Sequence, residues 1–447
     1  MLLSEKEARA FTDKILSLVS ADDASVNVGS NTVSHLRFAA NNFLTSGMRG
    51  TRSASVTLWI GGKRGSASTN DLDDASLREM VENAERIAKT APPDREYMPT
   101  LGKQVYRDSG GWVEATANLA LEKRAKAIAD IIAECEKSKV IGAGFHSAGA
   151  EAGAFATKNG NYSFSRSTTV GLSVTARAAD GGASGYFDRN HFDIAKLDTM
   201  HIAREAIRKA LSGSDPKTID PGSYSVILEP QATADLLGNF GFSFNARSAE
   251  EGRSVFSAPG GKTRVGEKIF DDRINIFSDP WNPDLPGSES AQDGIPAEKF
   301  YLVRGGVLEN LVYNRFWAKQ KGKQPSPGPV NTILQSSAKP SSLEEMIKAS
   351  KRAILIGRFW YIRSTEPRTA SLTGLTRDGV WLIEDGKIAY PLRNLRFNQS
   401  ITQMLGPDNV EFIGEPERVG GSEGGGGSLL PALKLKAFNF TSQSEAV

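Results

Sequence analysis

The sequence predicts an α+β protein in which an N-terminal α/β half is followed by a β-rich C-terminal domain of mixed sheets. Amphipathic helical patterns fall in the first half, whereas short alternating runs and turn dipeptides dominate the second. A chain of 447 residues is too long for one ordinary core. We therefore expect N-terminal subdomains over 1–105 and 106–214, and a C-terminal domain over 215–447.

The chain opens with an amphipathic helical pattern over Ser4–Val19. Ser4 and Glu7 have the spacing of a capping box, in which each side chain satisfies a free backbone N–H at the helix start. A second helix is predicted over Asp74–Ala91, where Pro92 follows and cannot continue it. Between these helices, β-branched and alternating residues predict strands over Ala24–Val28, Thr32–Ala39 and Ala54–Trp59.

The middle of the chain predicts a helix over Thr116–Glu136, a β-rich stretch over Val140–Tyr186 and a helix over Ile194–Leu211. Asn159-Gly160 predicts a hairpin with a type I′ turn, because both central residues of that turn need positive φ. Two prolines and two glycines mark Ser212–Ser223 as a linker. No internal repeat is visible in the sequence.

In the C-terminal half, two dipeptides predict hairpins and one segment predicts a short helix. Ser341–Ser350 is that helix, with Glu344 at capping-box spacing from Ser341. Gly420–Gly427 is a flexible loop by composition. The hairpin dipeptides are Gly305-Gly306 and Asp385-Gly386.

Composition excludes several classes of protein. The net charge of +2 does not favour nucleic acid as the partner. Cys135 is the single cysteine, which indicates a reducing cytoplasmic compartment. Acidic residues follow Leu3 at once, so we expect no signal peptide, and no long apolar stretch predicts a membrane span.

Several stretches together resemble the TldD/PmbA family, once called modulators of DNA gyrase. They occur in the order of the family and span nearly the whole chain. The resemblance implies an α/β half, then a β-rich half, and dimerisation. The stretches are His35–Phe43, Gly65–Asn70, Ala156–Asn190, Ser342–Ser400 and Pro431–Ser442.

The resemblance also implies where a zinc site would lie. TldD-type members resemble zinc peptidases with a His-Glu-x-x-x-His helix and a later cysteine near a Gly-rich loop, whereas PmbA (TldE) members lack these ligands and pair with the catalytic chain. In this chain the matching segments are Pro230–Ser254, without histidine, and Glu415–Gly427, without cysteine. A catalytic zinc needs three protein ligands. We therefore predict no catalytic residues, no metal ligands and no cofactor.

Three hypotheses follow. The first is a non-catalytic TldE/PmbA-like subunit that supports proteolysis of unfolded or leader peptides by a zinc-bearing TldD-like partner, as a heterodimer. The second is a stand-alone homodimer that binds peptides as a scaffold, and the third is an active hydrolase with a rearranged site. No two of the four histidines lie three or four residues apart; they are His35, His146, His191 and His201.

One predicted strand, Ala353–Arg363, carries the predicted peptide site. Strict alternation would place Ile354, Ile356, Arg358, Trp360 and Ile362 on one face. An arginine among apolar residues needs a partner, which is a buried carboxylate or a substrate group. If the partner is a substrate group, we expect Arg358, Tyr361 and Arg363 to line a cleft that receives an extended peptide by strand addition.

Overall fold

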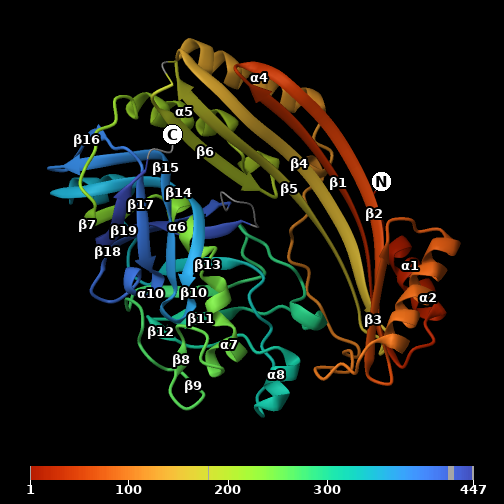
Figure 1. Cartoon of the computed structure of the whole chain (residues 1–447). Coiled ribbons are helices and arrows are strands. Elements are labelled where there is room, and N and C mark those ends of the chain that lie inside the picture. The colour runs from red at the N-terminus through yellow and green to blue at the C-terminus, as the bar shows by residue number, and fades with distance from the viewer. Residues whose placement is uncertain (1, 180, 421–426, 445–447) are drawn as a thin grey trace.

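The computed structural model describes residues 2–179, 181–420 and 427–444. Figure 1 shows long strands that arch past a separate C-terminal body. The N-terminal part contains α1 (Glu5–Leu18), β1 (Asp23–Ala39), β2 (Asn42–Ile60), β3 (Lys63–Thr69), α2 (Asp74–Thr90), α3 (Glu114–Ala117), α4 (Leu121–Lys137), β4 (Val140–Thr157), β5 (Tyr162–Ala178), β6 (Ser184–His191), η1 (Ile194–Lys196) and α5 (Thr199–Ser212).

The C-terminal part contains many short elements and a few long strands. They are β7 (Gly222–Leu228), α6 (Pro230–Leu237), η2 (Gly241–Phe244), α7 (Ala246–Glu250), β8 (Ser257–Ala258), β9 (Lys262–Thr263), β10 (Ile274–Ser278), η3 (Gln292–Gly294), β11 (Phe300–Arg304), β12 (Val307–Leu308), α8 (Arg315–Gln320), β13 (Thr332–Ser336), α9 (Leu343–Lys348), β14 (Arg352–Glu366), η4 (Pro367–Thr369), β15 (Ser371–Glu384), β16 (Lys387–Pro391), β17 (Leu395–Ser400), α10 (Ile401–Met404), β18 (Val410–Val419) and β19 (Ser428–Gln443). Within the part of the chain that the structure describes, no helix has the length and apolar character needed to cross a bilayer.

The N-terminal sheet is built from two copies of one unit. Its strand order is β3-β2-β1-β4-β5-β6, so two three-stranded meanders join through β1 and β4. Each meander lies between two helices in the chain, α1 and α2 for the first and α4 and α5 for the second. The sequence predicted no repeat, so this duplication is a finding of the structure. The predicted subdomains 1–105 and 106–214 share this one sheet, and their boundaries stay a prediction.

A glycine sets the closest helix–sheet approach in each unit. A Cβ added to Gly65 on β3 would lie 1.9 Å from the carbonyl oxygen of Ala84 on α2. A Cβ added to Gly185 on β6 would lie 2.2 Å from the carbonyl oxygen of Ala206 on α5. In both places only glycine allows the helix to pack this closely on the strand.

The two faces of this sheet differ sharply. Val26 and Val28 of β1 pack in the core under α1 and α2, while Leu36 and Phe38 of the same strand pack under α4 and α5. Because these residues alternate along one strand, all four helices cover the same face. The other face carries small polar residues, including Asn27, Asn31, Ser53, Ser165, Ser167 and Thr169.

The C-terminal strands form a closed ring. Pairing runs from β19 through β17, β15 and β14 to β7, and β7 pairs again with β19. Strands β13, β10, β11 and β12 extend the sheet from β19. Closure leaves these five strands with partners on both sides over part of their length, which protects the edges. This ring is the β-rich domain of mixed sheets that the sequence predicts, because β14–β7 and β13–β19 are parallel and the other pairs are antiparallel.

Helix α6 lies inside this domain and is buried on every side (Figure 1). All eight residues of its sequence, PQATADLL, are buried, and Gln231 and Asp235, four positions apart, share one polar side of the helix. Pro230 starts the helix, where a missing N–H costs nothing. The helix therefore presents Gln231 and Asp235 to the interior.

Most local predictions are confirmed. Helix α1 begins with the predicted capping box of Ser4 and Glu7. Helix α2 ends at Thr90 before the two prolines. Both residues of each predicted hairpin dipeptide have positive φ, at Gly305-Gly306 and at Asp385-Gly386.

Three local predictions are wrong in detail. The helix predicted over Thr116–Glu136 is two helices, α3 and α4, because the chain turns between Asn118 and Ala120. The hairpin at Asn159-Gly160 exists, but only Gly160 has positive φ and the loop is longer than a type I′ turn. The second capping box is made by Ser342 and Glu345, one residue later than predicted, because either serine of the pair satisfies the spacing. Of the predicted flexible loop, residues 421–426 lie outside the described residues.

The predicted faces of β14 are also wrong. Ile354 and Ile356 lie in the same core as Phe359 and Ile362, so the alternation reverses between them. The pairing with β15 slips between Ile356 and Arg358, again after Trp360 and again after Ser364. A β-bulge inserts one residue and moves every later side chain to the other face.

Candidate functional site

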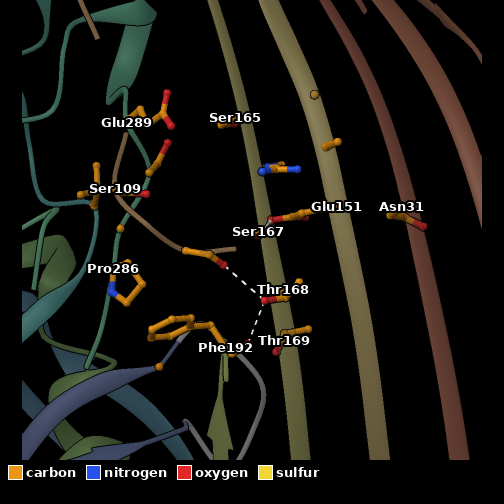
Figure 2. Close-up of a pocket in the computed structure, with 18 of the residues that line it drawn as sticks. Asn31, Ser109, Glu151, Ser165, Ser167, Thr168, Thr169, Phe192, Pro286 and Glu289 are labelled. Carbon is orange, nitrogen blue, oxygen red and sulfur yellow. Dashed lines mark hydrogen bonds between the residues drawn. The ribbon is translucent and has the colours of Figure 1, made fainter. Parts of the chain in front are cut away.

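A large cavity lies between the polar face of the N-terminal sheet and the C-terminal domain. Its volume is about 740 Å³. Figure 2 shows side chains of β1, β4 and β5 on one side, and Ser109, Pro286 and Glu289 on the other. The sheet wall consists mainly of Ser, Thr, Asn and Gly, so it offers hydroxyl and backbone groups without large side chains.

Two carboxyl groups line this cavity. Burial, and then the nearby charge of Asp108, raises the pKa of Glu289 to about 7. Glu151 on β4 accepts a hydrogen bond of 2.7 Å from the Ser167 hydroxyl. Glu289 therefore exchanges a proton near neutral pH, whereas Glu151 is held against the sheet.

The wall near Phe192 is fixed by Thr168. Its hydroxyl donates to the carbonyl of Phe192 at 2.8 Å and accepts from the N–H of Val113 at 3.1 Å. Its own N–H donates to the carbonyl of Gly111. These bonds tie the loop before α3 to β5 beside the cavity, which gives the cavity a rigid rim (Figure 2).

At one end the cavity meets the ends of the Gly-rich loop. Gly427 and Asn190 both line it. A Cβ on Gly420 would lie 2.8 Å from the Asn190 amide nitrogen and 3.4 Å from an oxygen of Asp188. The side chain of Arg418 donates to Asn190 at 3.2 Å, and burial lowers the pKa of Arg418 to about 10.

Behind this loop end lies α6, the helix where the resemblance implies zinc-binding histidines. Gln231 donates from one amide nitrogen to Asp235 at 2.9 Å and to the carbonyl of Gly420 at 2.7 Å. Asp235 also accepts from the N–H of Phe359 at 2.8 Å. The structure thus brings together the two segments, 189 residues apart, in which the family ligands are expected.

These residues do not fit a zinc site of that type. Such a site needs three ligand atoms with free lone pairs, mostly imidazole, thiolate or carboxylate. Here the amide N–H groups of Gln231 point at the available oxygens, and Asp235 is occupied by two donors. Within 2–179, 181–420 and 427–444, no cluster of three or more His, Cys, Asp or Glu is placed to hold a metal.

Two buried ion pairs lie around α6, one that joins the two domains and one within the C-terminal domain. Lys209 of α5 lies 2.5 Å from Glu229, which directly precedes α6, and the side chains are 2% and 8% exposed. Arg358 of β14 lies 3.0 Å from Asp378 of β15 and over the ring of Tyr186 of β6. Each charge has an opposite partner, which offsets the cost of removing it from water.

Asp188 is a carboxylate of this junction whose hydrogen bonding is incomplete. Burial is the main cause that raises its pKa to about 6. One of its oxygens has no hydrogen-bond partner, as is true of Gln231 Oε1 and Thr233 Oγ1 nearby. The junction is therefore polar and only partly satisfied by its own side chains.

The histidines and the cysteine have structural positions. His35 stacks on Phe145, and His201 packs edge-on against Phe187. The ring of His191 accepts from the N–H of Asp193 at 2.9 Å. Cys135 is buried in α4, and burial raises the pKa of its thiol to about 11. A thiol with so high a pKa is a poor nucleophile.

The structure does not bring the three predicted peptide-binding residues onto one surface. Arg358 is buried in its ion pair with Asp378. Tyr361 is 59% exposed with φ of 55°, and the guanidinium of Arg363 lies 4.4 Å from its ring. Tyr361 and Arg363 thus form one exposed pair, and a role in peptide binding stays a prediction.

Sequence reasoning missed Asp188, Gln231 and Glu289. Asp188 lies inside a stretch that resembles the family, and Gln231 lies inside the segment searched for histidine. Neither residue type nor spacing marks them, because their significance comes from contacts across domains. Glu289 in the loop after β10 carried no signal at all.

Models of one family match the three parts of the chain. The "PmbA/TldA metallopeptidase domain 1" matches residues 24–88, the central domain matches 113–213, and the C-terminal domain matches 221–442. The fold and domain order thus define a protein of the metallopeptidase-like class. The chain belongs to the PmbA/TldD family.

Known proteins agree with this assignment. A "Metalloprotease PmbA homolog" of Haemophilus influenzae is 21% identical over 436 residues, which cover 90% of each chain. A "Metalloprotease" of Methanothermobacter thermautotrophicus is 24% identical over 309 residues, and the match spans 62% of this chain and 63% of that relative. The crystal structure of TldE from Thermococcus kodakarensis has the same fold, with a TM-score of 0.83 at 17% identity over 98% of this chain and 99% of that one.

Proposed function

We propose that this protein is a non-catalytic, TldE/PmbA-like subunit that supports peptide hydrolysis by a zinc-bearing TldD-like chain in the cytoplasm. One observation carries the proposal. The helix and the loop in which family ligands are expected do meet, and there Gln231 donates to Asp235 within the helix and to the carbonyl of Gly420 at the loop. The three family domains are present in order, while the described parts of the segments in which ligands are expected hold a hydrogen-bonded network.

In this proposal the cavity contributes to the chamber that receives substrate. Its sheet wall offers hydroxyl and amide groups from residues such as Asn31, Ser165 and Ser167. Such groups form hydrogen bonds with any peptide backbone and do not select side chains. This chemistry suits unfolded or leader peptides of varied sequence.

The exposed pair of Tyr361 and Arg363 is a second proposed contact for peptide. Among the described strands, β7 pairs with β14 only over Ile354–Ile356, so the later part of β14 has β15 as its one paired neighbour. A strand with a free side accepts an added strand through its backbone. An acidic or C-terminal group of the peptide would then meet Arg363.

The first experiment measures metal. Tag-free protein, purified without added metal, is analysed for zinc content and for assembly mass. We expect no stoichiometric zinc and no chelator-sensitive peptidase activity. About one zinc per chain, with activity that a chelator abolishes, would refute the proposal.

The second experiment measures cooperation. The chain is mixed with a His-Glu-x-x-x-His homologue from the same source, and hydrolysis of an unstructured reporter peptide is followed. We expect a complex of the two chains and a higher rate than the homologue shows alone. If the rate and the mass stay those of the separate chains, the stand-alone homodimer becomes the better hypothesis.

Variants then separate the two proposed peptide surfaces. Ser165→Trp fills the cavity, and its matched control is Ser17→Trp on the exposed surface of α1. Arg363→Ala removes the exposed cation, and its control is the exposed Arg396→Ala on β17. We expect Ser165→Trp and Arg363→Ala to weaken peptide binding about tenfold while the controls do not.

The third hypothesis, a hydrolase with a rearranged site, has one observation in its favour, the proton exchange expected of Glu289 near pH 7. Peptide hydrolysis by the lone chain that persists in chelator and disappears in Glu289→Gln would establish it.

A further inference from the structure

A buried arginine occupies a core position of α4. The buried residues of this helix are Arg124, Ile128, Ile131 and Cys135, whose spacing forms one stripe toward the sheet. Apolar side chains fill the other three places. A guanidinium at such a position carries a large desolvation cost unless it has a partner.

Arg124 has no such partner in the described structure. The residue is 4% exposed, and its Nε and Nη1 atoms make no hydrogen bond. Burial alone lowers its pKa. The neighbouring His146 can supply no negative charge, and it adds no second positive one, because burial and then the charge of Arg124 lower its pKa to about 4 and keep it neutral. A positive charge is thus held inside the protein without a carboxylate.

The same arginine lines a second cavity of about 400 Å³, on the helix-covered side of the sheet. Its walls combine apolar and hydroxyl groups: Thr32, Ser34, Ser46, Met48, Thr116, Ala117, Leu119, Leu121 and Ala148. This cavity is separate from the one in Figure 2. The residues of β1 and β4 that line the two cavities belong mainly to opposite faces of the sheet. The second cavity has room for a molecule about the size of a capped amino acid.

The start of α4 adds a second anion-attracting feature. The N-cap residue is Ala120, and no side chain caps the first turn. Free N–H groups at the start of a 17-residue helix favour an anion there. The charged residues of this turn, Glu122 and Lys123, are both exposed and offset each other. Leu119 and Leu121 lie on either side of the N-cap and line the cavity.

We propose that this cavity binds a small monocarboxylate with an apolar body, whose carboxylate pairs with Arg124 at the start of α4. A guanidinium binds a carboxylate through two parallel hydrogen bonds. The walls formed by Met48, Leu119 and Leu121 suit an apolar chain. One guanidinium matches one negative charge, which favours a carboxylate over a phosphate dianion. This site is independent of the proposed role in peptide hydrolysis.

The test compares two probes of equal shape on the full chain. N-acetyl-L-leucine carries the carboxylate, and N-acetyl-L-leucinamide replaces it by a neutral amide. We expect the acid to bind about tenfold or more tightly than the amide in calorimetry and to raise the melting temperature. Hexanoate tests whether a simple acyl carboxylate binds as well as the peptide-like acid. Inorganic phosphate tests whether a free anion binds. Equal binding of the acid and the amide, or no binding of any carboxylate, overturns the proposal.

Variants locate the site. In Arg124→Met, the preference for the acid over the amide should fall at least about tenfold. The protein should remain folded and melt no lower, because a buried charge without a partner is removed. Lys123→Met, at the neighbouring exposed cation, should bind the acid like the parent chain. If Arg124→Met melts far lower, Arg124→Gln gives the same comparison, and unchanged binding in the folded variant contradicts the proposal.

Discussion

The two units of the N-terminal sheet have the same architecture and opposite surroundings. Strand β3 of the first unit is an edge strand that forms one bridge outside the sheet, from Lys63 to Pro93. Strand β6 of the second unit lies against the C-terminal domain and contacts Arg358 and Glu417. The glycine contacts give a residue-by-residue alignment of the two units. Gly65 matches Gly185, and the residues of α2 nearest to Gly65 match the residues of α5 nearest to Gly185. By this alignment Ile87, 45% exposed, matches Lys209, 2% exposed.

A few matched positions distinguish the unit at the domain junction from the other unit. On the polar face, Ser66 and Ser68 of β3 match Tyr186 and Asp188 of β6. The first unit has small exposed hydroxyl groups at these places, and the second carries a ring under Arg358 and a half-buried carboxylate with one buried oxygen. At these matched positions the first unit is thus exposed, while the second contacts the C-terminal domain.

The largest effect should come from the matched pair Lys209 and Ile87. Lys209→Met leaves the buried carboxylate of Glu229 without its partner, which costs about 3–5 kcal/mol. Ile87→Met changes an exposed side chain and should stay within about 0.5 kcal/mol. Urea denaturation of both variants measures the contrast. Equal losses would show that the second unit does not depend on the buried pair.

The glycine contacts test whether the units are equivalent. Gly65→Ala and Gly185→Ala each force a helix backbone away from its strand, so each should cost about 1–3 kcal/mol. Gly29→Ala is the control, since the nearest atom to the added Cβ lies 3.9 Å away. Thermal melting compares the three. If only one of Gly65→Ala and Gly185→Ala lowered the melting temperature, the two units would not be equivalent at this contact.

The carboxylate of Asp188 should give the second unit a pH dependence that the first lacks. Its folded pKa of about 6 exceeds the ordinary 3.8, so its stabilising contribution is complete below about pH 4 and is lost as pH rises through 6. Asp188→Asn should therefore equal the parent protein at pH 4 and exceed it by about 1–3 kcal/mol at pH 7. Denaturation at both pH values tests this, and a constant difference would contradict the raised pKa.

The smallest effect is expected at Ser68, which matches Asp188. Its side chain is exposed on the open part of the sheet. Ser68→Ala should change the free energy of unfolding by no more than about 0.5 kcal/mol at either pH. A larger loss, measured by the same denaturation, would mean that the open face has its own structural partner.

Sequence reasoning succeeded where structure is local. The capping box of Ser4 and the hairpin at Asp385-Gly386 depend on residues a few positions apart, and both are present. The duplication was invisible because matched positions hold different residues, such as Ile87 and Lys209, and the core positions share only apolar character. The faces of β14 were wrong because bulges depend on the neighbouring strand.

The candidate site shows the same limit. The family resemblance led to the segment that contains α6, which has no histidine, and to the Gly-rich loop, which has no cysteine. The hydrogen bond from Gln231 to Gly420 joins residues 189 positions apart, so no local pattern predicts it. Likewise, Arg358 was expected to need a partner, but only the folded chain identifies Asp378.

The position of β19 has a consequence for how the chain is made. This last strand lies at the centre of the C-terminal sheet and pairs with β7, which the ribosome releases some two hundred residues earlier. The N-terminal sheet is complete once α5 has emerged, but β7 must wait until β19 has been made to gain this neighbour. During that interval its unpaired edge invites wrong pairing or a chaperone. A premature stop before Ser428 would therefore remove β19 and leave the ring open.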